Sequence, residues 1–547
     1  MKLFCHSCTI LLFCSFHSNS QIFPGWYRVE LTNKNHSNFS IQHPEDFLSA
    51  RALQRRANQS IPVAENDLPV SEFYLDSLKK LGIPVKNVSK WFNSVVTWPI
   101  DTTQVKLLQS LGFVSHITLV KPATITKKST KFHGFKSLEP GLWFDYGQGL
   151  DQIAIHNGDR LHHLGYTGKG IHMAIIDAGF KNAVSLLAFQ KLWRNNQVLG
   201  YRDFAIPGSD IFSEHSHGTT VLSVIASYIP GVLTGTAPDA SFWLLRSEDA
   251  NTEFLIEEDN WVSAAEFADS AGADIINSSL GYSLFDLTEQ NHTYADMNGN
   301  TTRISLAADL AASKGMLIVT SAGNDGVTDW KYITAPADAD SALAVAATDF
   351  TGNIAYFSSR GPSADGRIKP DVSAVGLGTY IFSYMGQLSQ TRGTSVSSPI
   401  IAGLAACLWQ ANRSATNMQV LQAILESSDR FESPDTTYGY GIPDFQKANL
   451  ILKSKYRSKS DTTFTFHLFP NPFSHELYLS LESDSETAAV VNIYNHPGSI
   501  RKKFNVQLNR GYNLLLLEEL SALPAGIYFL DIRSGTYSSS LKVIKIQ

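Results

Sequence analysis

Residues 392–409 read RGTSVSSPIIAGLAACLW, a short polar turn followed by an unbroken apolar run. Gly393 and Thr394 precede Ser395 in the turn, and Pro399 stands immediately before the run. Because proline is favoured at the start of a helix, the pattern predicts a helix over 400–409 with a rigidly held serine before it. Backbone N–H groups at such a turn can face a negatively charged oxygen. Ser395 is therefore a candidate nucleophile.

Two further segments supply the groups that a serine needs for activation. In residues 175–179, IIDAG, a buried strand ends in Asp177, and chemistry in open parallel sheets gathers at the carboxyl ends of strands. In residues 215–220, HSHGTT, His217 precedes a stretch with apolar residues on one helical face. A neutral imidazole can accept the proton of a serine hydroxyl, and a carboxylate can orient the imidazole.

A fourth segment, residues 320–326, reads TSAGNDG and brings the amide of Asn324 into a glycine turn after a strand. Alone, this segment is equally typical of a plain turn. His215 and His217 also allow a metal site with Asp177, but the additional carboxylates or thiolates that zinc prefers are not nearby in the sequence. An esterase of the α/β-hydrolase type needs a second glycine after the serine and the order Ser, Asp, His, and the chain has neither.

In the order Asp177, His217, Asn324, Ser395, these segments resemble the subtilase family of serine proteases. The resemblance implies a catalytic triad of Asp177, His217 and Ser395, with Asn324 in the oxyanion hole. The chain departs from the family pattern at Ala178, Thr220, Val396 and Ser397. The resemblance also implies substrate-binding residues in two segments, which are Ser279, Leu280, Gly281, Ser321, Ala322 and Gly323.

The pattern from 168 to 452 predicts an α/β fold, a subtilisin-like parallel sheet with helices on both faces, because apolar strands alternate with helical stretches. We assign the peptidase domain to 143–452. Residues 21–142 are predicted to hold a small α+β unit and a linker rich in Lys, Thr and Pro. This unit resembles subtilase propeptides, which implies an intramolecular inhibitor. Its predicted strands are 26–31, 93–98 and 113–120, and its predicted helices are 44–57, 71–81 and 101–111.

The last part of the chain is predicted to be a polar linker, 453–463, and a small β-sandwich, 464–547, built from short alternating strands. The motifs FPNPF (469–473) and LPAGIYF (523–529), with the basic-apolar end of the chain, resemble C-terminal sorting domains of the type IX secretion system. The resemblance implies type IX machinery as a partner. A generic binding sandwich is the alternative.

Residues 1–20 are predicted to be a signal peptide, with a basic start, an apolar centre and small residues at the cleavage site. Its removal would leave Cys407 as the last of the four cysteines, so no intrachain disulfide is expected. A net charge of -6 and a pI near 6.2 argue against a nucleic-acid partner.

These features together predict a secreted serine endopeptidase, at the cell surface or released, that acts on protein or peptide substrates through an acyl-enzyme intermediate. The alternative is a catalytically inactive surface adhesin on the same scaffold. No cofactor is expected for catalysis. Structural calcium is compatible with the family resemblance, but the sequence does not identify its ligands.

Overall fold

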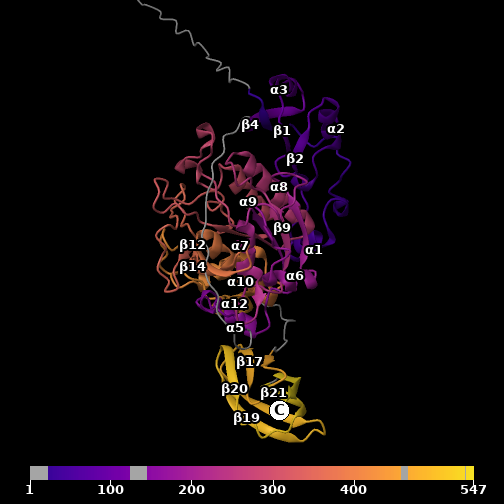
Figure 1. Ribbon diagram of the computed structural model, residues 1–547. Helices are drawn as coiled ribbons and strands as arrows, with labels where there is room; N and C mark the ends of the chain where they lie inside the picture. Colours follow the sequence, from indigo (N-terminus) through magenta and orange to yellow (C-terminus); the bar gives the residue numbers. More distant parts are fainter. Residues whose placement is uncertain (1–22, 124–144, 457–465, 536, 547) are drawn as a thin grey trace, which may run out of the picture.

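The computed structural model describes residues 23–123, 145–456, 466–535 and 537–546. The chain forms three units: the last lies at one end of the molecule, and the first lies at the other end and along one side of the central unit (Figure 1). The predicted signal peptide, 1–20, and most of the predicted linker 121–142 lie outside the described residues. Within the described residues, no helix is both long and apolar enough to span a membrane.

The central unit is built on a seven-stranded sheet in which every neighbouring pair of strands is parallel. The strands, in spatial order, are β13 (Val372–Val375), β12 (Ala342–Thr348), β11 (Leu317–Ser321), β10 (Ile275–Ser278), β5 (His172–Asp177), β9 (Ser241–Arg246) and β6 (Val198–Asp203). Parallel neighbours need crossover connections, and helices lie in the connections that join β5, β6, β9, β10 and β11 in sequence order.

Helices cover both faces of this sheet. Met173 and Ile175 of β5 pack in one core with helices α7 (His217–Ala226) and α10 (Thr394–Ala411). The alternate residues Ala174 and Ile176 pack in a second core with α8 (Ile256–Ala271) and α9 (Arg303–Ser313). Successive side chains of a strand point to opposite faces, which explains the two separate cores. The predicted α/β fold with helices on both faces is confirmed.

Helix α10 begins at Thr394, six residues before the predicted helix start, and Pro399 lies inside it. Proline has no N–H, so the carbonyl of Ser395, four residues earlier, has no helical donor. The hydroxyl of Ser279 donates to that carbonyl over 2.9 Å. The prediction of a helix starting at the proline was wrong, because a side-chain donor replaces the missing helical bond. Cys407 is a free, buried cysteine in this helix.

Shorter elements complete the central unit. The helices α11 and α12 pack together beside α10, and two small antiparallel pairs of strands lie outside the main sheet. The remaining elements are α4 (Leu150–Ala154), α5 (Gly158–His163), α6 (Gln190–Arg194), α11 (Asn417–Ser427), α12 (Phe445–Tyr456), β7 (Tyr228–Ile229) with β8 (Leu233–Thr234), and β14 (Leu377–Phe382) with β15 (Leu388–Arg392).

The first unit is a four-stranded antiparallel sheet with two helices packed on it, the predicted α+β arrangement. One strand, β2, was missed, because its sequence VKNVS places polar residues at most positions. In spatial order the strands are β2 (Val85–Ser89), β3 (Ser94–Thr97), β1 (Gly25–Leu31) and β4 (Val114–Pro122); the helices are α1 (Ala50–Asn58), α2 (Glu72–Lys80) and α3 (Thr102–Gln109).

Buried ionic contacts join the first unit to helix α8. Asp269, fully buried on α8, pairs with Arg55 at 2.5 Å, with Arg56 at 2.9 Å and with Lys90 at 2.9 Å. Burial alone would raise the pKa of Asp269, but these three cations outweigh it and lower the pKa from 3.8 to about 2. Glu266, one turn earlier, accepts hydrogen bonds from the Ser89 hydroxyl and from two backbone N–H groups. The first unit is therefore held through charge as well as apolar packing.

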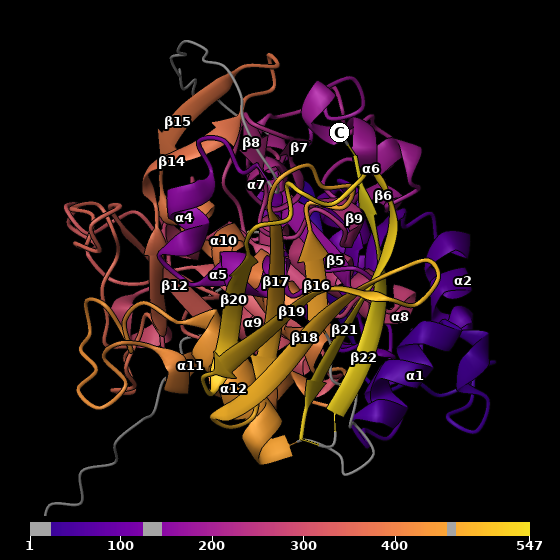
Figure 2. The ribbon, with the colours of Figure 1, turned by 90° about the horizontal axis from the view of Figure 1, so that it is seen from below.

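The last unit is formed by two antiparallel sheets around a core of its own, as predicted for a β-sandwich. Figure 2 looks onto its strands from below, with the central unit behind them. Helix α12 continues to Tyr456, so residues 453–456 are helical rather than linker, and 457–465 lie outside the described residues. One sheet holds β16 (Phe466–Phe469), β17 (Leu477–Ser483) and β20 (Gly511–Leu517); the other holds β19 (Ile500–Leu508), β18 (Thr487–Asn495), β21 (Gly526–Ser534) and β22 (Tyr537–Lys545).

We expect Asp269→Asn to lower the free energy of unfolding by about 3–5 kcal/mol, because it leaves buried cations facing a neutral amide. Urea denaturation of the full chain, with the candidate nucleophile replaced as Ser395→Ala, measures the change. The matched control is Asp76→Asn on the exposed face of α2. Equal unfolding free energies for the two variants would contradict the assigned role of Asp269.

Candidate active site

Asp177 and His217 meet at the carboxyl end of the central sheet. Asp177 is the last residue of β5, and His217 is the first residue of α7. His217 Nδ1 lies 2.8 Å from Asp177 Oδ1, which also accepts the N–H of Ala178 over 2.7 Å. Asp177 is completely buried, so its carboxylate cannot turn toward water. This contact fixes the imidazole ring with Nε2 directed away from the aspartate.

Asp177 Oδ2 has no hydrogen-bond partner among the described residues, although it is buried. The family resemblance leads us to expect a serine or threonine at position 178, whereas Ala178 offers only its backbone N–H. All of the hydrogen bonding to this carboxylate therefore falls on Oδ1.

Ser395 lies in the first turn of α10, where backbone N–H groups have no helical acceptors. Its position depends on a short chain of hydrogen bonds behind the helix. Ser398 Oγ donates to Asn277 Oδ1 at 2.9 Å, and Asn277 Nδ2 donates to Ser279 Oγ at 3.0 Å. Ser279 Oγ in turn donates to the Ser395 carbonyl. The serine is thus held to the end of β10 by its own backbone.

The amide of Asn324 follows β11 and faces the same helix start. Its Oδ1 accepts the Thr394 N–H at 2.8 Å and the Thr394 hydroxyl at 3.1 Å. Because the oxygen is used in this way, Nδ2 remains free to donate. A Cβ placed on Gly393 would lie 2.9 Å from Ser395 Oγ and 3.8 Å from Asn324 Nδ2, so both groups border the same small space. Gly393, with φ +143°, leaves that space open.

Among the hydrogen bonds of the described residues, none joins Ser395 Oγ to His217. Catalytic hydrogen bonds of free enzymes are often long and form fully only with substrate bound. The His217 side chain is 29% exposed, so its ring remains accessible from the solvent side.

Two opposing effects set the pKa of His217. Burial acts to lower it, but the charge of Asp177 and the hydrogen bond to it outweigh burial and raise the pKa above 6.5. A raised folded-state pKa means that protonated His217 stabilises the fold below about pH 6.5, and that this stabilisation is lost as the pH rises through the folded pKa. Neighbouring His215 behaves oppositely, since burial and the nearby His217 lower its pKa.

The predicted substrate-binding residues lie at the carboxyl ends of β10 and β11. Leu280 and Gly281 are partly or fully exposed, whereas Ser279 and Ser321 are buried. A Cβ on Gly281 would come within 2.2 Å of Thr334 Oγ1, so a larger residue here would require the Thr334 side chain to move.

Ala322 and Gly323 have most of their backbone groups committed within the protein. The Ala322 N–H donates to the Val345 carbonyl at 3.0 Å, and the Gly323 N–H donates to Thr394 Oγ1 at 3.2 Å. These residues can line a pocket but offer few backbone groups to a ligand. The structure therefore brings all six predicted residues to one edge of the sheet, and gives Ser279 a structural contact that the sequence did not show.

Sequence reasoning missed three residues that position the site. Thr394 orients Asn324, and Asn277 supports Ser279. Arg246, buried at the end of β9, donates to the Ala178 carbonyl at 3.1 Å and pairs with Asp203 and Glu214. The sequence features that could have pointed to these residues are the threonine inside the serine motif, Thr394, and the single cation at the end of the apolar strand SFWLLR, Arg246. Neither feature indicates which residue, distant in sequence, is its partner.

The alternative metal site on the two histidines finds no support among the described residues. The ring centroids of His215 and His217 are 6.4 Å apart, and neither histidine belongs to a group of three converging metal-ligand side chains among the described residues. The described side chains that do converge closely enough for a metal are Glu248, Glu253 and Glu257.

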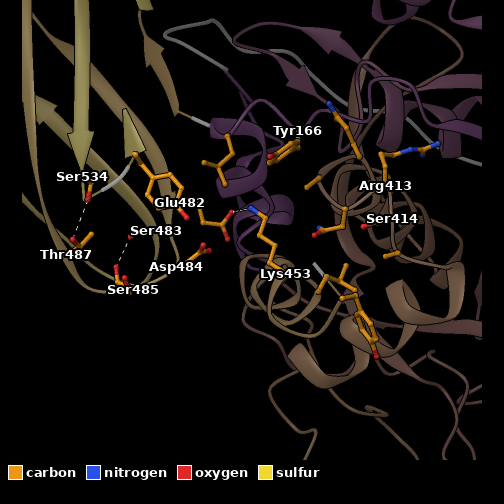
Figure 3. Close-up of a pocket in the computed structure, with 18 of the residues that line it drawn as sticks. Tyr166, Arg413, Ser414, Lys453, Glu482, Ser483, Asp484, Ser485, Thr487 and Ser534 are labelled. Atoms are coloured by element: carbon orange, nitrogen blue, oxygen red, sulfur yellow. Dashed lines mark hydrogen bonds and ion pairs between the residues drawn. The ribbon is translucent and has the colours of Figure 1, made fainter. Parts of the chain in front are cut away.

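A separate pocket of about 430 Å³ lies between the central unit and the β-sandwich. Figure 3 shows Lys453 directed toward Glu482 across this pocket, with Arg413 and Tyr166 on the side of the central unit. None of its lining residues is a predicted site residue. The pocket is thus distinct from the candidate active site.

Family comparison assigns each unit. Residues 168–441 match the subtilase family, and the chain belongs to that family. Residues 26–133 match the peptidase S8 propeptide domain of Bacteroidota. Residues 467–547 match a secretion system C-terminal sorting domain, which indicates type IX secretion to the cell surface or outside. The three predicted resemblances are confirmed.

Individual relatives are proteases. The mouse (Mus musculus) membrane-bound transcription factor site-1 protease is 28% identical over 388 residues, covering 64% of this chain and 33% of the mouse protein. Subtilisin E of Bacillus subtilis is 28% identical over 304 residues, covering 55% of this chain and 70% of that protein. The chain therefore spans about a third of the length of the mouse relative.

Among solved structures, the prenylagaramide maturation protease PagA is similar, with 23% identity and a TM-score of 0.44. The similar region covers 55% of this chain and 99% of that one.

We expect His217 to titrate above pH 6.5 and His215 to titrate below it, since the carboxylate of Asp177 contacts only His217 directly. NMR of histidine-labelled protein resolves the two titrations. Asp177→Asn should lower the pKa of His217 by more than one unit, because the opposing charge is lost while burial remains. The reverse order of the two pKa values would contradict the assigned geometry.

Proposed function

We propose that the chain is a secreted serine endopeptidase that hydrolyses peptide bonds through Asp177, His217 and Ser395. The observation that carries the proposal is the 2.8 Å contact between His217 Nδ1 and Asp177 Oδ1, formed beside a helix start that holds Ser395. This is the arrangement that a serine nucleophile needs, a base and a group that orients the base. Membership of the subtilase family supports the same reading.

In the first step, neutral His217 accepts the hydroxyl proton of Ser395 as its oxygen attacks the scissile carbonyl. The ring is then an imidazolium, stabilised by the buried carboxylate of Asp177. It returns the proton to the leaving amine, and an acyl group remains on Ser395. Water, activated by the same imidazole, releases the acyl group in the second step.

Negative charge develops on the carbonyl oxygen during both steps. The Ser395 N–H lies in the first turn of α10, and Asn324 Nδ2 borders the same space. Two donors held before the reaction stabilise that charge without reorganisation. The contact from Thr394 to Asn324 Oδ1 keeps the amide in the donating orientation.

The first unit is suited to be an intramolecular inhibitor. Lys121, near the end of β4, reaches the segment that follows β9, where it pairs with Asp249 at 3.3 Å and contacts Thr252. That segment begins beside the catalytic strand, since the Ser247 N–H donates to the Asp177 carbonyl at 3.0 Å. Lys121 is thus linked, through residues 247–252, to the strand that carries Asp177.

Labelling with a fluorophosphonate probe separates this proposal from its alternatives. The probe reacts with an activated serine, so modification should map to Ser395 and be insensitive to chelators. An inactive adhesin would not be labelled. A metallohydrolase would lose activity to chelators and ignore the probe.

We expect Ser395→Ala to abolish both peptidase activity and removal of the first unit, because one nucleophile serves both reactions. In subtilisin, loss of the nucleophile lowers kcat on the order of a million-fold, and we adopt that magnitude. Casein hydrolysis and the size of the secreted protein measure the two effects. Ser389→Ala on β15 is the control and should keep full activity. Near-normal hydrolysis by Ser395→Ala would exclude the proposed mechanism.

Removing residues 464–547 should leave an active peptidase in the periplasm, because the β-sandwich has its own core and holds no site residue. Fractionation followed by fluorophosphonate labelling measures both location and activity. Full-length Ser395→Ala is the control and should be exported normally. Normal export of the truncated protein would instead favour a binding sandwich.

A further inference from the structure

Three glutamates converge beside the candidate active site without taking part in it. Glu248 follows β9, Glu253 lies in the next loop and Glu257 is in the first turn of α8. One carboxylate oxygen from each lies within 4.8 Å of the others. Glu248 and Glu257 are buried, with exposures of 7% and 1%, so this is not a cluster of solvated surface charges.

The hydrogen bonds of the protein satisfy only part of this cluster. Glu248 Oε1 accepts from the hydroxyls of Tyr282 and Ser247, and Glu257 Oε1 accepts from the Asp249 N–H at 3.2 Å. Glu257 Oε2 is buried and has no hydrogen-bond partner among the described residues. A buried carboxylate oxygen without a donor is costly, and it indicates a missing positive partner.

Nearby cations are already engaged elsewhere. Lys121 pairs with Asp249, and Arg246 pairs with Asp203 and Glu214. Among the ion pairs of the described residues, none includes Glu248, Glu253 or Glu257. Burial therefore raises the pKa of Glu248 to about 7 and the pKa values of Glu253 and Glu257 well above the usual range.

We propose that Glu248, Glu253 and Glu257 form a binding site for a hard divalent cation, with calcium as the ion that fits best. Carboxylate oxygens, here supplied by a loop and a helix start, are the donors that calcium prefers, with water completing its six to eight ligands. Thiolate and imidazole ligands are absent from the three, which disfavours zinc. A bound cation would supply the charge that Glu257 Oε2 lacks.

A cation at this site would stabilise the edge of the sheet at which the predicted substrate-binding residues lie. Ser247, beside Glu248, holds the Asp177 carbonyl, and Tyr282, bonded to Glu248, follows Gly281. A cation on the three glutamates would therefore tie the end of β9 and the start of α8 to the segment after β10. The cation would act on stability and not on the bond-breaking steps, so the inference stands apart from the proposed function.

The test uses the full chain carrying Ser395→Ala, so that no self-cleavage occurs. Calcium at saturating concentration should raise the Tm by roughly 5 °C relative to the chelator-treated protein. Terbium, a calcium substitute, should show luminescence excited through protein aromatic side chains, with Tyr282 directly beside the site.

Glu257→Gln should remove both the calcium-dependent rise in Tm and the terbium signal, because it replaces a ligand by a neutral group of the same shape. Glu253→Gln, at a half-buried position where misfolding is less of a risk, should weaken terbium binding at least about tenfold. Glu289→Gln, at an exposed position outside the cluster, is the matched control and should respond as the parent does. A parent that shows no calcium response, or a Glu257→Gln protein with the parental response, would overturn the proposal.

Discussion

The carbonyl of Ser395 is the point on which the site depends. Pro399 removes its helical donor, and Ser279 supplies a replacement from the end of β10. Without the proline, the helix would satisfy this carbonyl internally, and its first turn would have no specific tie to the sheet. With it, the start of a helix buried over most of its length is tied to the strand edge where Asp177 and Asn324 also lie. The proline and its replacement donor thus help to place Ser395 beside Asp177 and Asn324, which are far apart in the sequence.

Acidic residues of helix α8 take part in two different contacts. Glu257, at the start of the helix, belongs to the buried carboxylate cluster, while Glu266 and Asp269, in its later turns, form hydrogen bonds and ion pairs with the first unit. The two groups differ in their partners. Asp269 is surrounded by cations and keeps its charge at a pKa of about 2, whereas Glu257, which has no ion pair within the described part of the chain, has a strongly raised pKa. Burial acts in the same direction on both, so the difference arises from the neighbouring charges and from the hydrogen bonds that each carboxylate accepts.

Much of the site could be predicted from the sequence because its motifs are local. Asp177, His217, Asn324 and Ser395 each stand beside a strand end, glycine turn or helix start that short-range patterns reveal. The supporting contacts could not be predicted in this way. The hydrogen bond from Ser279 to Ser395 spans 116 residues, and the ion pair from Arg55 to Asp269 spans 214. The start of α10 was misplaced for the same reason, since Ser279, the donor that compensates for Pro399 inside the helix, is far from it in the sequence.

The two flanking units are attached in physically different ways. The first unit shares apolar packing with the central unit, because Trp91 lies in the core beneath α8 and Val120 packs with Phe254. The β-sandwich keeps a core of its own and meets the central unit through part-buried polar contacts, such as the hydrogen bond from Ser480 to the His163 carbonyl and the pair of Lys453 with Glu482, and through the stacking of His163 on Phe469. Buried apolar surface is the larger source of stability, and the first unit shares such surface with the central unit. The first unit is therefore attached through shared buried apolar surface and buried ion pairs, whereas the last unit keeps a core separate from the fold that carries the site.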